Sequence, residues 1–523
     1  MTDTPAVTPT PASAEPQLAA ERLRLMRHAV VNNLSVPIAA LVGIVLVPIM
    51  LRALGQDNYG LWVVAISLSA ILTASDLGLG WSICRLVAAD PEGREGDHVA
   101  FVRSAGNISA LMGLAAACVL GFAGLLSGNR LHLAPMAQKA APEVFWLVGA
   151  SLLLERVSGF GSAVLTGLRR FELTNLVASS TAVLWGIAAI IALVSGGSVP
   201  AVATCLLGTS LVKCGITLAF VARLSPRYAF KPGLIRWWSV RNHVSFAFSS
   251  LLVELFSGLA WNCGPVLLGF FRGPTAAVPY YIGQKFPLAV SGMSWRSAEV
   301  LFPAASQNLN DADRSRDILR VGSRWVLALA LPFAVLLFVA APHLLQAWIG
   351  SVPAGAVPIL RLLAVVVVLD AVAAGPLLML WGRGAIKTVV ATQVGLGIGV
   401  VALSTMCTFL VGAAGAALGL LVPLGAAAVV FFAAACRLCM IPPLRLLADT
   451  WRGLALPVAV CAASAALLLQ LKGHGRLWVI AVLAVSALAY LTVLFGVSGN
   501  ADEKHFARDA LTRILSLFRK VPA

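Results

Sequence analysis

Long apolar stretches alternate with short polar segments along the chain from about residue 30 to residue 497. An α-helix needs about 20 consecutive, mostly apolar residues to cross the hydrocarbon core of a bilayer. About fourteen stretches meet this need, at 30–51, 60–80, 105–126, 144–166, 176–194, 201–222, 244–268, 276–303, 324–341, 356–379, 388–410, 413–436, 454–471 and 477–497. The polar segments between them reach only about 20 residues, so we expect no catalytic domain outside the membrane.

Composition supports the membrane interpretation and explains the charge. The 523 residues are 59% hydrophobic and 11% charged, against roughly 25% charged in soluble domains. The net charge of +16 would also suit a nucleic-acid-binding protein. However, about 27 of the 38 Lys and Arg residues fall on one side of the predicted spans, about 6 on the other and about 5 within them. The excess is therefore topological, and it places both termini in the cytoplasm.

The order of the spans predicts an all-α integral membrane protein with two parallel six-helix lobes and two extra C-terminal helices. The predicted parts are a cytoplasmic disordered tail (1–29), a first lobe (30–224), a basic linker (225–243), a second lobe (244–441), helices thirteen and fourteen (454–497) and a cytoplasmic amphipathic helix (498–523). Weak internal repetition supports two lobes, since Tyr59 follows the first span much as Tyr281 follows the seventh, about 222 residues later. A repeat of six spans starts and ends on one side, which gives parallel topology.

Several short motifs occur in a characteristic order. They are LRALGQDNYGLW (51–62), SDLGLG (75–80), LTGLRRFELTN (165–175), LFPA (301–304) and WIG followed by PILRLLA (358–364). With this order and spacing, residues 30–440 resemble the polysaccharide flippases of the O-antigen type. These belong to the MOP exporter superfamily, together with MATE drug antiporters and the lipid II flippase.

The resemblance implies a transporter and not an enzyme. Its expected substrate is an undecaprenyl-pyrophosphate-linked oligosaccharide repeat unit, moved from the cytoplasmic to the periplasmic leaflet of a bacterial inner membrane by alternating access. The product would serve O-antigen, capsule or exopolysaccharide synthesis, with a polymerase and a chain-length regulator as further partners of a monomeric protein. The alternatives are a MATE-like drug or metabolite antiporter and a lipid II flippase.

Basic residues within the spans are candidates for substrate binding, because a charge inside the bilayer is costly and must face a cavity or a partner. A diphosphate needs such groups, and both Arg and Lys bind phosphate well. The candidates are Lys285, Arg296, Lys213, Arg52, Arg156 and Arg361. Lys285 and Arg296 lie about 16 Å apart on nearly one helix face. Ion pairing is the alternative for each, with Glu299 beside Arg296; for Arg52 it is snorkelling to the interface.

Acidic residues within the spans are candidates for ion coupling. The sequence has no GxxxxGK[ST] motif, so a flippase of this kind must be passive or driven by an ion gradient. The candidates are Glu254, Asp370, Glu155 and Asp76, which could carry a proton or bind Na⁺; the alternative is that they neutralise nearby cations. We expect no other cofactor, no catalytic residue and no metal site. Cys436 and Cys439 form a CxxC without a second ligand pair nearby, and we interpret them as packing residues.

Overall fold

A computed structural model describes residues 35–73, 79–130, 135–241, 244–299, 301–307, 311–471 and 475–498. Within these ranges the chain forms helices joined by short turns and contains no β-strand. The predicted N-terminal tail and C-terminal amphipathic helix lie outside the described residues.

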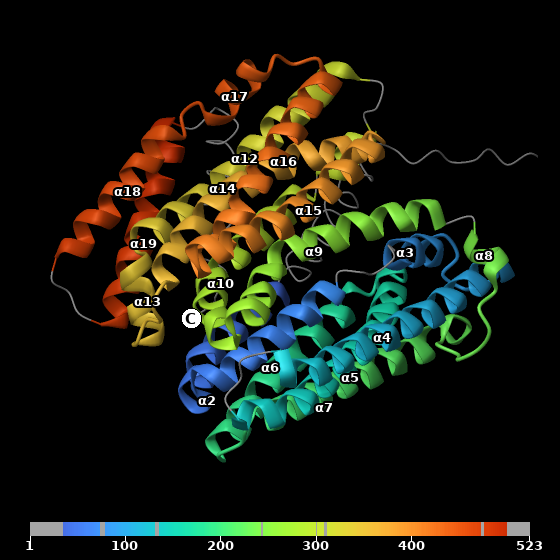
Figure 1. Ribbon diagram of the computed structural model, residues 1–523. Coiled ribbons are helices and arrows are strands. Elements are labelled where there is room, and N and C mark those ends of the chain that lie inside the picture. Colours follow the sequence, from blue (N-terminus) through green and yellow to red (C-terminus); the bar gives the residue numbers. More distant parts are fainter. Residues whose placement is uncertain are drawn as a thin grey trace, which may run out of the picture. The chain divides into compact units, whose positions relative to one another are not determined.

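The helices follow one another closely along the chain (Figure 1). The first group is α2 (Ser35–Thr73), α3 (Leu79–Ala89), α4 (Gly96–Arg130), α5 (Pro135–Gly167), α6 (Phe171–Val194), α7 (Val199–Leu224), the 3-10 turn η1 (Pro226–Tyr228) and α8 (Trp237–Arg241). The second group is α9 (Val244–Arg272), α10 (Pro274–Ala298), α11 (Leu301–Gln307), α12 (Ala312–Val339), α13 (Ala341–Ile349), α14 (Ala356–Gly382), α15 (Ile386–Val411), α16 (Ala413–Cys439), α17 (Pro443–Trp451), α18 (Ala455–Gln470) and α19 (Arg476–Val493).

The predicted all-α membrane architecture is confirmed. Among the described residues, eleven helices are long and apolar enough to cross a membrane, and the bent pair α17 and α18 makes a twelfth candidate. Two features account for the difference from about fourteen predicted spans. Helix α2 has 39 residues, about twice the length that one span needs, and covers the first and second predicted spans. Helix α10 corresponds to the eighth, but its Lys, Arg, Gly and Pro residues lower its hydrophobicity.

Gly55 marks the division within α2. Its backbone has φ 75° and ψ 171°, which interrupts the helical geometry. A residue with a Cβ atom adopts positive φ only at a cost, whereas glycine does so freely. The glycine in the LRALG motif therefore allows the chain to turn between the two predicted spans.

Contacts between residues divide the chain into two compact units. Unit 1 comprises Met1–Ile49, Gly78–Gly121 and Phe145–Ala247, and unit 2 comprises Met50–Leu77, Phe122–Val144 and Phe248–Ala523. Most of α3 to α8 falls in unit 1, and α10 to α19 with all but the first turn of α9 fall in unit 2. The sequence-based lobe boundaries remain a prediction.

Close helix contacts in unit 1 depend on glycine. A Cβ atom at Gly149 on α5 would lie 2.9 Å from the carbonyl oxygen of Ala117 on α4. One at Gly161 would lie 2.7 Å from the Thr217 side chain on α7. Small residues bring membrane helices close enough to pack backbone against side chain. Helix α5 is thus held between α4 and α7, which fixes the polar residues on its inner turns.

Helix α14 is the most buried element of unit 2. It packs against α10, α12 and α16, and the C-terminal pair α18 and α19 is attached through α12 (Figure 1). Gly283 on α10 packs against Ile359 and Leu360 of α14, where a Cβ atom would approach within 2.9 Å. This contact sets the register between α10 and α14, the two helices that carry the polar groups of unit 2.

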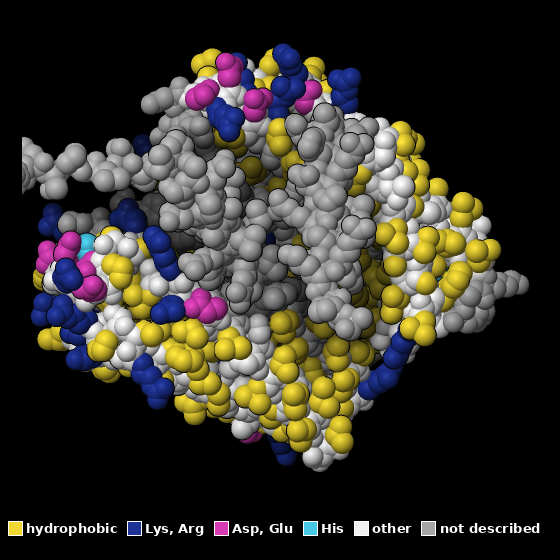
Figure 2. All heavy atoms as spheres, turned by 180° about the vertical axis from the view of Figure 1, so that it is seen from behind, with side chains coloured by type: hydrophobic (Ala, Val, Ile, Leu, Met, Phe, Trp, Pro, Cys, Tyr) yellow, Lys and Arg dark blue, Asp and Glu magenta, His cyan; other side chains and the backbone are white. Residues whose placement is uncertain are grey.

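The surface is apolar over large areas. Figure 2 shows hydrophobic side chains over much of the described surface, while charged side chains gather in a few clusters. Ile191 and Val429, for example, are 61% and 68% exposed. Exposed apolar area on this scale needs an apolar surrounding, and the span lengths show that this surrounding is the bilayer.

Candidate functional site

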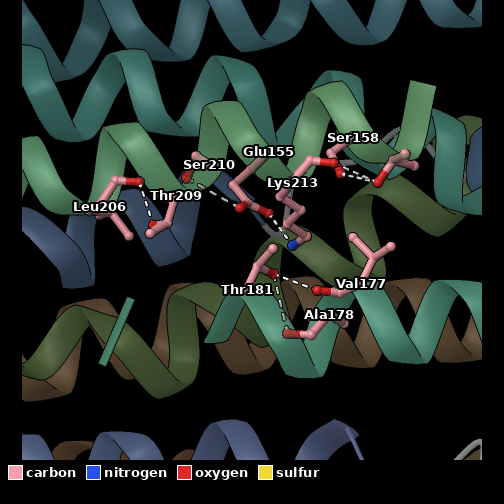
Figure 3. Close-up of polar contacts among 10 residues, drawn as sticks. Glu155, Ser158, Val177, Ala178, Thr181, Leu206, Thr209, Ser210 and Lys213 are labelled. Atoms are coloured by element: carbon pink, nitrogen blue, oxygen red, sulfur yellow. Dashed lines mark hydrogen bonds and ion pairs between the residues drawn. The ribbon is translucent and has the colours of Figure 1, made fainter. Parts of the chain in front are cut away.

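Unit 1 contains an ion pair within its apolar helices. Lys213 Nζ on α7 lies 2.6 Å from Glu155 Oε2 on α5, and the side chains are 26% and 36% exposed. The Ser210 hydroxyl donates to Glu155 Oε1 at 3.3 Å. Figure 3 shows these three side chains converging from the two helices. The pair neutralises two charges that each carry a high cost in the bilayer.

Neighbouring hydroxyl groups hold the two helices in register around this pair. Ser158 Oγ and Thr217 Oγ1 lie 3.4 Å apart, in the next turn of α5 and α7 (Figure 3). Thr217 also donates to the carbonyl oxygen of Lys213 at 2.7 Å. The Thr217 hydroxyl is thus anchored to the backbone of its own helix and faces Ser158 of α5.

Arg156 follows Glu155 directly but plays a different part in the packing. It is 7% exposed, and its Cβ atom lies beneath Gly113 of α4, where an added Cβ would be 3.0 Å away. The sequence left open whether Lys213 or Arg156 pairs with Glu155. The ion pair forms with Lys213 because α5 and α7 meet on that side.

Unit 2 contains a buried carboxylate that is stabilised by neutral donors. Asp370 on α14 is 3% exposed. Its Oδ2 accepts a hydrogen bond from the Ser291 hydroxyl and one of 2.9 Å from the Trp295 indole Nε1, both on α10. No Lys or Arg in the described ranges forms an ion pair with it. Neutralisation of a nearby cation, the alternative to ion coupling for this acid, is not observed for Asp370 among the described residues.

Lys285 lies on the same helix α10 and is half-buried. Its Nζ donates to the Tyr281 hydroxyl at 2.7 Å and sits 4.0 Å from the centre of the Tyr281 ring. Tyr281 in turn packs edge-on against Tyr59 of α2, with the ring centres 6.3 Å apart. The described part of the chain provides no carboxylate partner for Lys285. Its positive charge is thus held by aromatic groups.

The other three predicted cations of unit 2 are exposed, and each binds a carboxylate or a backbone carbonyl oxygen. Arg296 pairs with Glu299 at 3.7 Å, which is the alternative that the i, i+3 spacing suggested. Arg52 donates to the Ile349 carbonyl oxygen at 3.0 Å, and Arg361 donates to the Phe338 carbonyl oxygen at 3.2 Å. None of these three joins Lys285 in a common cluster of hydrogen bonds.

Two further acids were predicted as candidates for ion coupling. Glu254 is half-buried on α9, and Asp76 lies outside the described residues. The two neighbouring tyrosines on α10 differ in burial. Tyr280 is 1% exposed and packs against the backbone of Gly264, which makes it a packing residue, whereas Tyr281 is half-buried beside Lys285.

The hydrogen-bond donors to the acids, and the contact between Tyr59 and Tyr281, were missed by sequence analysis. Ser210, Ser291 and Trp295 each bind a predicted acid, and Tyr59 supports Tyr281. The signal for Tyr59 and Tyr281 was present, since they occupy similar positions in the two proposed repeats. For Ser291 and Trp295, the i, i+4 spacing on a helix that also carries Lys285 was the available indication.

Comparison with solved structures defines the class of fold. Over 93% of this chain and 100% of the other, it is similar to "Lipid II flippase MurJ, inward closed conformation", with a TM-score of 0.69 and 12% identity. It is similar to an inward-facing "multidrug resistance MATE family transporter of the MOP superfamily", with a TM-score of 0.58, 16% identity and coverage of 80% and 98%. A third similar structure is that of the "MATE multidrug transporter DinF-BH", with a TM-score of 0.62, 13% identity and coverage of 80% and 96%. The chain therefore has the fold that these flippase and transporter structures share.

The family follows from the sequence match. Residues 25–309 match the family described as "Polysaccharide biosynthesis protein", and this is more than half of the chain. The chain therefore belongs to the polysaccharide biosynthesis protein family, and its long apolar helices make it a multi-pass membrane protein. No curated protein matches it.

Proposed function

We propose that this protein is a flippase for undecaprenyl-pyrophosphate-linked oligosaccharide repeat units. It would move them from the cytoplasmic to the periplasmic leaflet of the bacterial inner membrane by alternating access, for synthesis of a surface polysaccharide. The observation that carries the proposal is Lys285, a half-buried cation with a tyrosine and no carboxylate beside it in the described structure. The diphosphate of the substrate is an anion that this ammonium group can bind.

Pairing distinguishes Lys285 from the other predicted cations. Lys213 and Arg296 have carboxylate partners at 2.6 Å and 3.7 Å, so substrate phosphate would have to compete with an ion pair already formed. Lys285 requires no such exchange, because a tyrosine hydroxyl can be replaced by phosphate without leaving a buried charge. Tyr281 can then present its ring to a sugar of the same substrate, since aromatic rings combine an apolar face with a polar edge.

Asp370 is the strongest candidate for ion coupling in the proposed mechanism. A carboxylate at the interior of a helix bundle is stabilised when a proton or a cation accompanies it. The two neutral donors on α10 leave that role open to H⁺ or Na⁺. Because α10 carries Ser291 and Trp295 as well as Lys285, an ion at Asp370 and a substrate at Lys285 would act on one helix.

A lipid II flippase is the second candidate function. The fold likeness to MurJ covers the whole of that chain, including a region beyond the 80% of this chain that the MATE structures cover. Lipid II is also a lipid-linked diphosphate, so both candidates use the same cationic chemistry. A drug antiporter is the less favoured function, because a positively charged drug would be repelled by Lys285, which has no carboxylate partner in the described structure.

Deletion of the gene in its host tests the proposal. Lipid extracts are analysed for undecaprenyl-pyrophosphate-linked oligosaccharide, and surface polysaccharide is stained in parallel. Accumulated lipid-linked repeats with loss of surface polymer are expected, with rescue by the wild-type gene but not by Lys285→Ala at equal protein level. Unchanged glycolipids together with altered drug tolerance would contradict the proposal and indicate a drug antiporter. Arrest of cell-wall synthesis would identify the lipid II flippase.

A further inference from the structure

Unit 1 has a second polar site, whose lining residues do not include Glu155 or Lys213. A cavity of about 500 Å³ opens between the start of α4 and the linker that follows α7. Small-molecule sites have volumes of about 300 to 1,000 Å³, so the cavity can hold a ligand of the size of a phosphodiester headgroup. It is formed by the segments 93–107 and 227–236.

The lining of this cavity is strongly basic. Arg94, Arg103, Arg227, Lys231 and Arg236 contribute to it, and the lining residues in the described structure include no Asp or Glu. Arg94 is paired with Glu92, with the guanidinium and carboxylate 2.5 Å apart. For the other four cations the described residues provide no ion pair. Four uncompensated positive charges around one cavity attract an anion.

Hydrogen bonds to the backbone hold the two sides of the cavity together. Arg227 Nη1 donates to the carbonyl oxygen of Gly93 at 2.9 Å. In return, Arg103 Nε donates to the carbonyl oxygen of Arg227 at 3.1 Å. The backbone N–H of Arg236 donates to the hydroxyl of Ser104 at 3.1 Å. Because these bonds use only part of each guanidinium group, the remaining N–H groups of Arg103 and Arg227 are positioned to bind a ligand.

The turn before α4 is fixed independently of the cations. The Asp90 carboxylate accepts hydrogen bonds from the backbone N–H groups of Arg94 at 3.0 Å and Glu95 at 2.8 Å, and these bonds lower the pKa of Asp90 below its ordinary value. The Tyr228 hydroxyl donates to the Asp90 carbonyl oxygen at 2.6 Å. Burial, followed by the nearby Asp90 charge, raises the pKa of Tyr228 to about 12. The tyrosine therefore remains a hydrogen-bond donor and keeps the linker attached to the turn.

Large apolar side chains are exposed on the linker, within the cavity lining and directly after it in the chain. Leu234, which lines the cavity, is 96% exposed, and Trp237 and Trp238 are 63% and 54% exposed. Tryptophan is enriched at the level of lipid headgroups, where its ring meets both apolar and polar surroundings. Basic side chains followed directly by exposed Leu and Trp are the combination that binds a headgroup and the start of its acyl chains.

We propose that this cavity is a binding site for the phosphate group of an anionic membrane phospholipid. Arg103, Arg227, Lys231 and Arg236 bind the phosphate, and Leu234 and the two tryptophans contact the lipid beside it. The site differs from the proposed substrate site, which lies in unit 2, and does not depend on the flippase function. Free phosphate shares the same chemistry and is the alternative source of the ligand.

Binding to the purified full-length protein in detergent tests the proposal. The probes are phosphatidylglycerol, phosphatidylcholine and inorganic phosphate, and lipid affinity is measured by native mass spectrometry and by titration. The pocket variant is Arg103→Gln with Lys231→Gln. The matched control is Arg223→Gln with Arg241→Gln, which removes the same charge from exposed residues of the same region that do not line the cavity.

We expect phosphatidylglycerol to bind more tightly than phosphatidylcholine. Each cation near the bilayer surface contributes about fivefold in affinity, so the pocket variant should bind phosphatidylglycerol roughly 25-fold more weakly and the control about as well as wild type. Equal losses in both variants, or equal affinity for the two lipids, would overturn the proposal. Displacement of phosphatidylglycerol by millimolar inorganic phosphate at constant ionic strength would instead show a site for free phosphate. If the pocket variant does not fold, Lys231→Gln alone gives the same test at an exposed residue.

Discussion

The two units accommodate a lysine inside the membrane region in opposite ways. In unit 1, Lys213 lies 2.6 Å from the carboxylate of Glu155. In unit 2, Lys285 lies 2.7 Å from the hydroxyl of Tyr281, and Asp370 is bound by Ser291 and Trp295. The first unit thus joins its acid and base in one pair, whereas the second keeps Asp370 and Lys285 apart.

The difference bears on which charged residues hold the helices together and which are available to bind a ligand. A pair of opposite charges lowers its own electrostatic cost and offers little to a ligand. A cation and an acid that are each held only by neutral groups retain their capacity for an anion and a proton or metal ion. We therefore propose that unit 2 carries substrate binding and ion coupling, and that the Glu155–Lys213 pair holds α5 and α7 in register.

The largest effect is expected for Lys285→Gln. Loss of a hydrogen bond to a charged group costs about 1.5 to 3 kcal/mol, which corresponds to roughly 10- to 150-fold in transport of the lipid-linked oligosaccharide. Flipping in reconstituted vesicles measures it. Arg361→Gln is the matched control, because this exposed cation donates to a backbone carbonyl oxygen instead. Equal losses in both variants would remove the distinction between Lys285 and the other cations.

Asp370→Asn should abolish the effect of an ion gradient while leaving the fold intact. The amide oxygen of Asn can accept the bonds from Ser291 and Trp295, but the side chain can no longer take up a proton or pair with Na⁺. Flipping is measured with an imposed H⁺ or Na⁺ gradient and without it. Wild type should respond to one gradient and the variant to neither, with Glu299→Gln responding as wild type does. A full response in the Asp370 variant would exclude this acid as the coupling group.

A smaller, structural effect is expected for the unit 1 pair. Glu155→Gln or Lys213→Gln leaves one charge without its partner and should destabilise the protein by about 1 to 3 kcal/mol, less than for a fully buried pair because both side chains are partly exposed. The double variant should regain part of the loss, since no charge is left over. Thermal unfolding in detergent measures the stability. A double variant that is stable but fails to transport would show that Lys213 contacts the substrate.

The smallest effect concerns the turn before α4 and its pH dependence. Because the folded pKa of Asp90 is lowered from 3.8, the carboxylate stabilises the turn above that pH and loses its contribution as pH falls through the folded pKa. Hydrogen exchange of the Arg94 and Glu95 amides should therefore become less protected below about pH 3.8 relative to Asp90→Asn. A difference between the two proteins that does not change with pH would contradict this role of the charge.

Hydrophobic pattern predicted the number and positions of the spans well, for a physical reason. A continuous apolar stretch has few alternatives to a membrane helix, and each predicted span overlaps a helix. The form of the turn between the first two predicted spans was harder to predict, because it depends on the local backbone geometry at Gly55. The pattern placed the eighth span on α10 although Lys, Arg, Gly and Pro residues lower the hydrophobicity of this helix.

The polar sites could be predicted as a set of residues but not as pairs. Glu155, Lys213, Lys285 and Asp370 stand out because charged residues are rare in spans. Which of them meet depends on the rotation of each helix, and that is set by contacts such as Gly161 with Thr217 and Gly283 with Ile359. The basic cavity was recognised only as an excess of positive charge, because its walls come from segments more than 100 residues apart.

Direct binding of undecaprenyl pyrophosphate to the purified protein tests the central distinction between the two lysines. The measurement compares wild type, Lys285→Gln and the double variant Glu155→Gln with Lys213→Gln. We predict that Lys285→Gln weakens binding roughly tenfold or more, while the double variant binds about as tightly as wild type. Weakened binding in the double variant with unchanged binding in Lys285→Gln would contradict the account and place the substrate at the unit 1 pair.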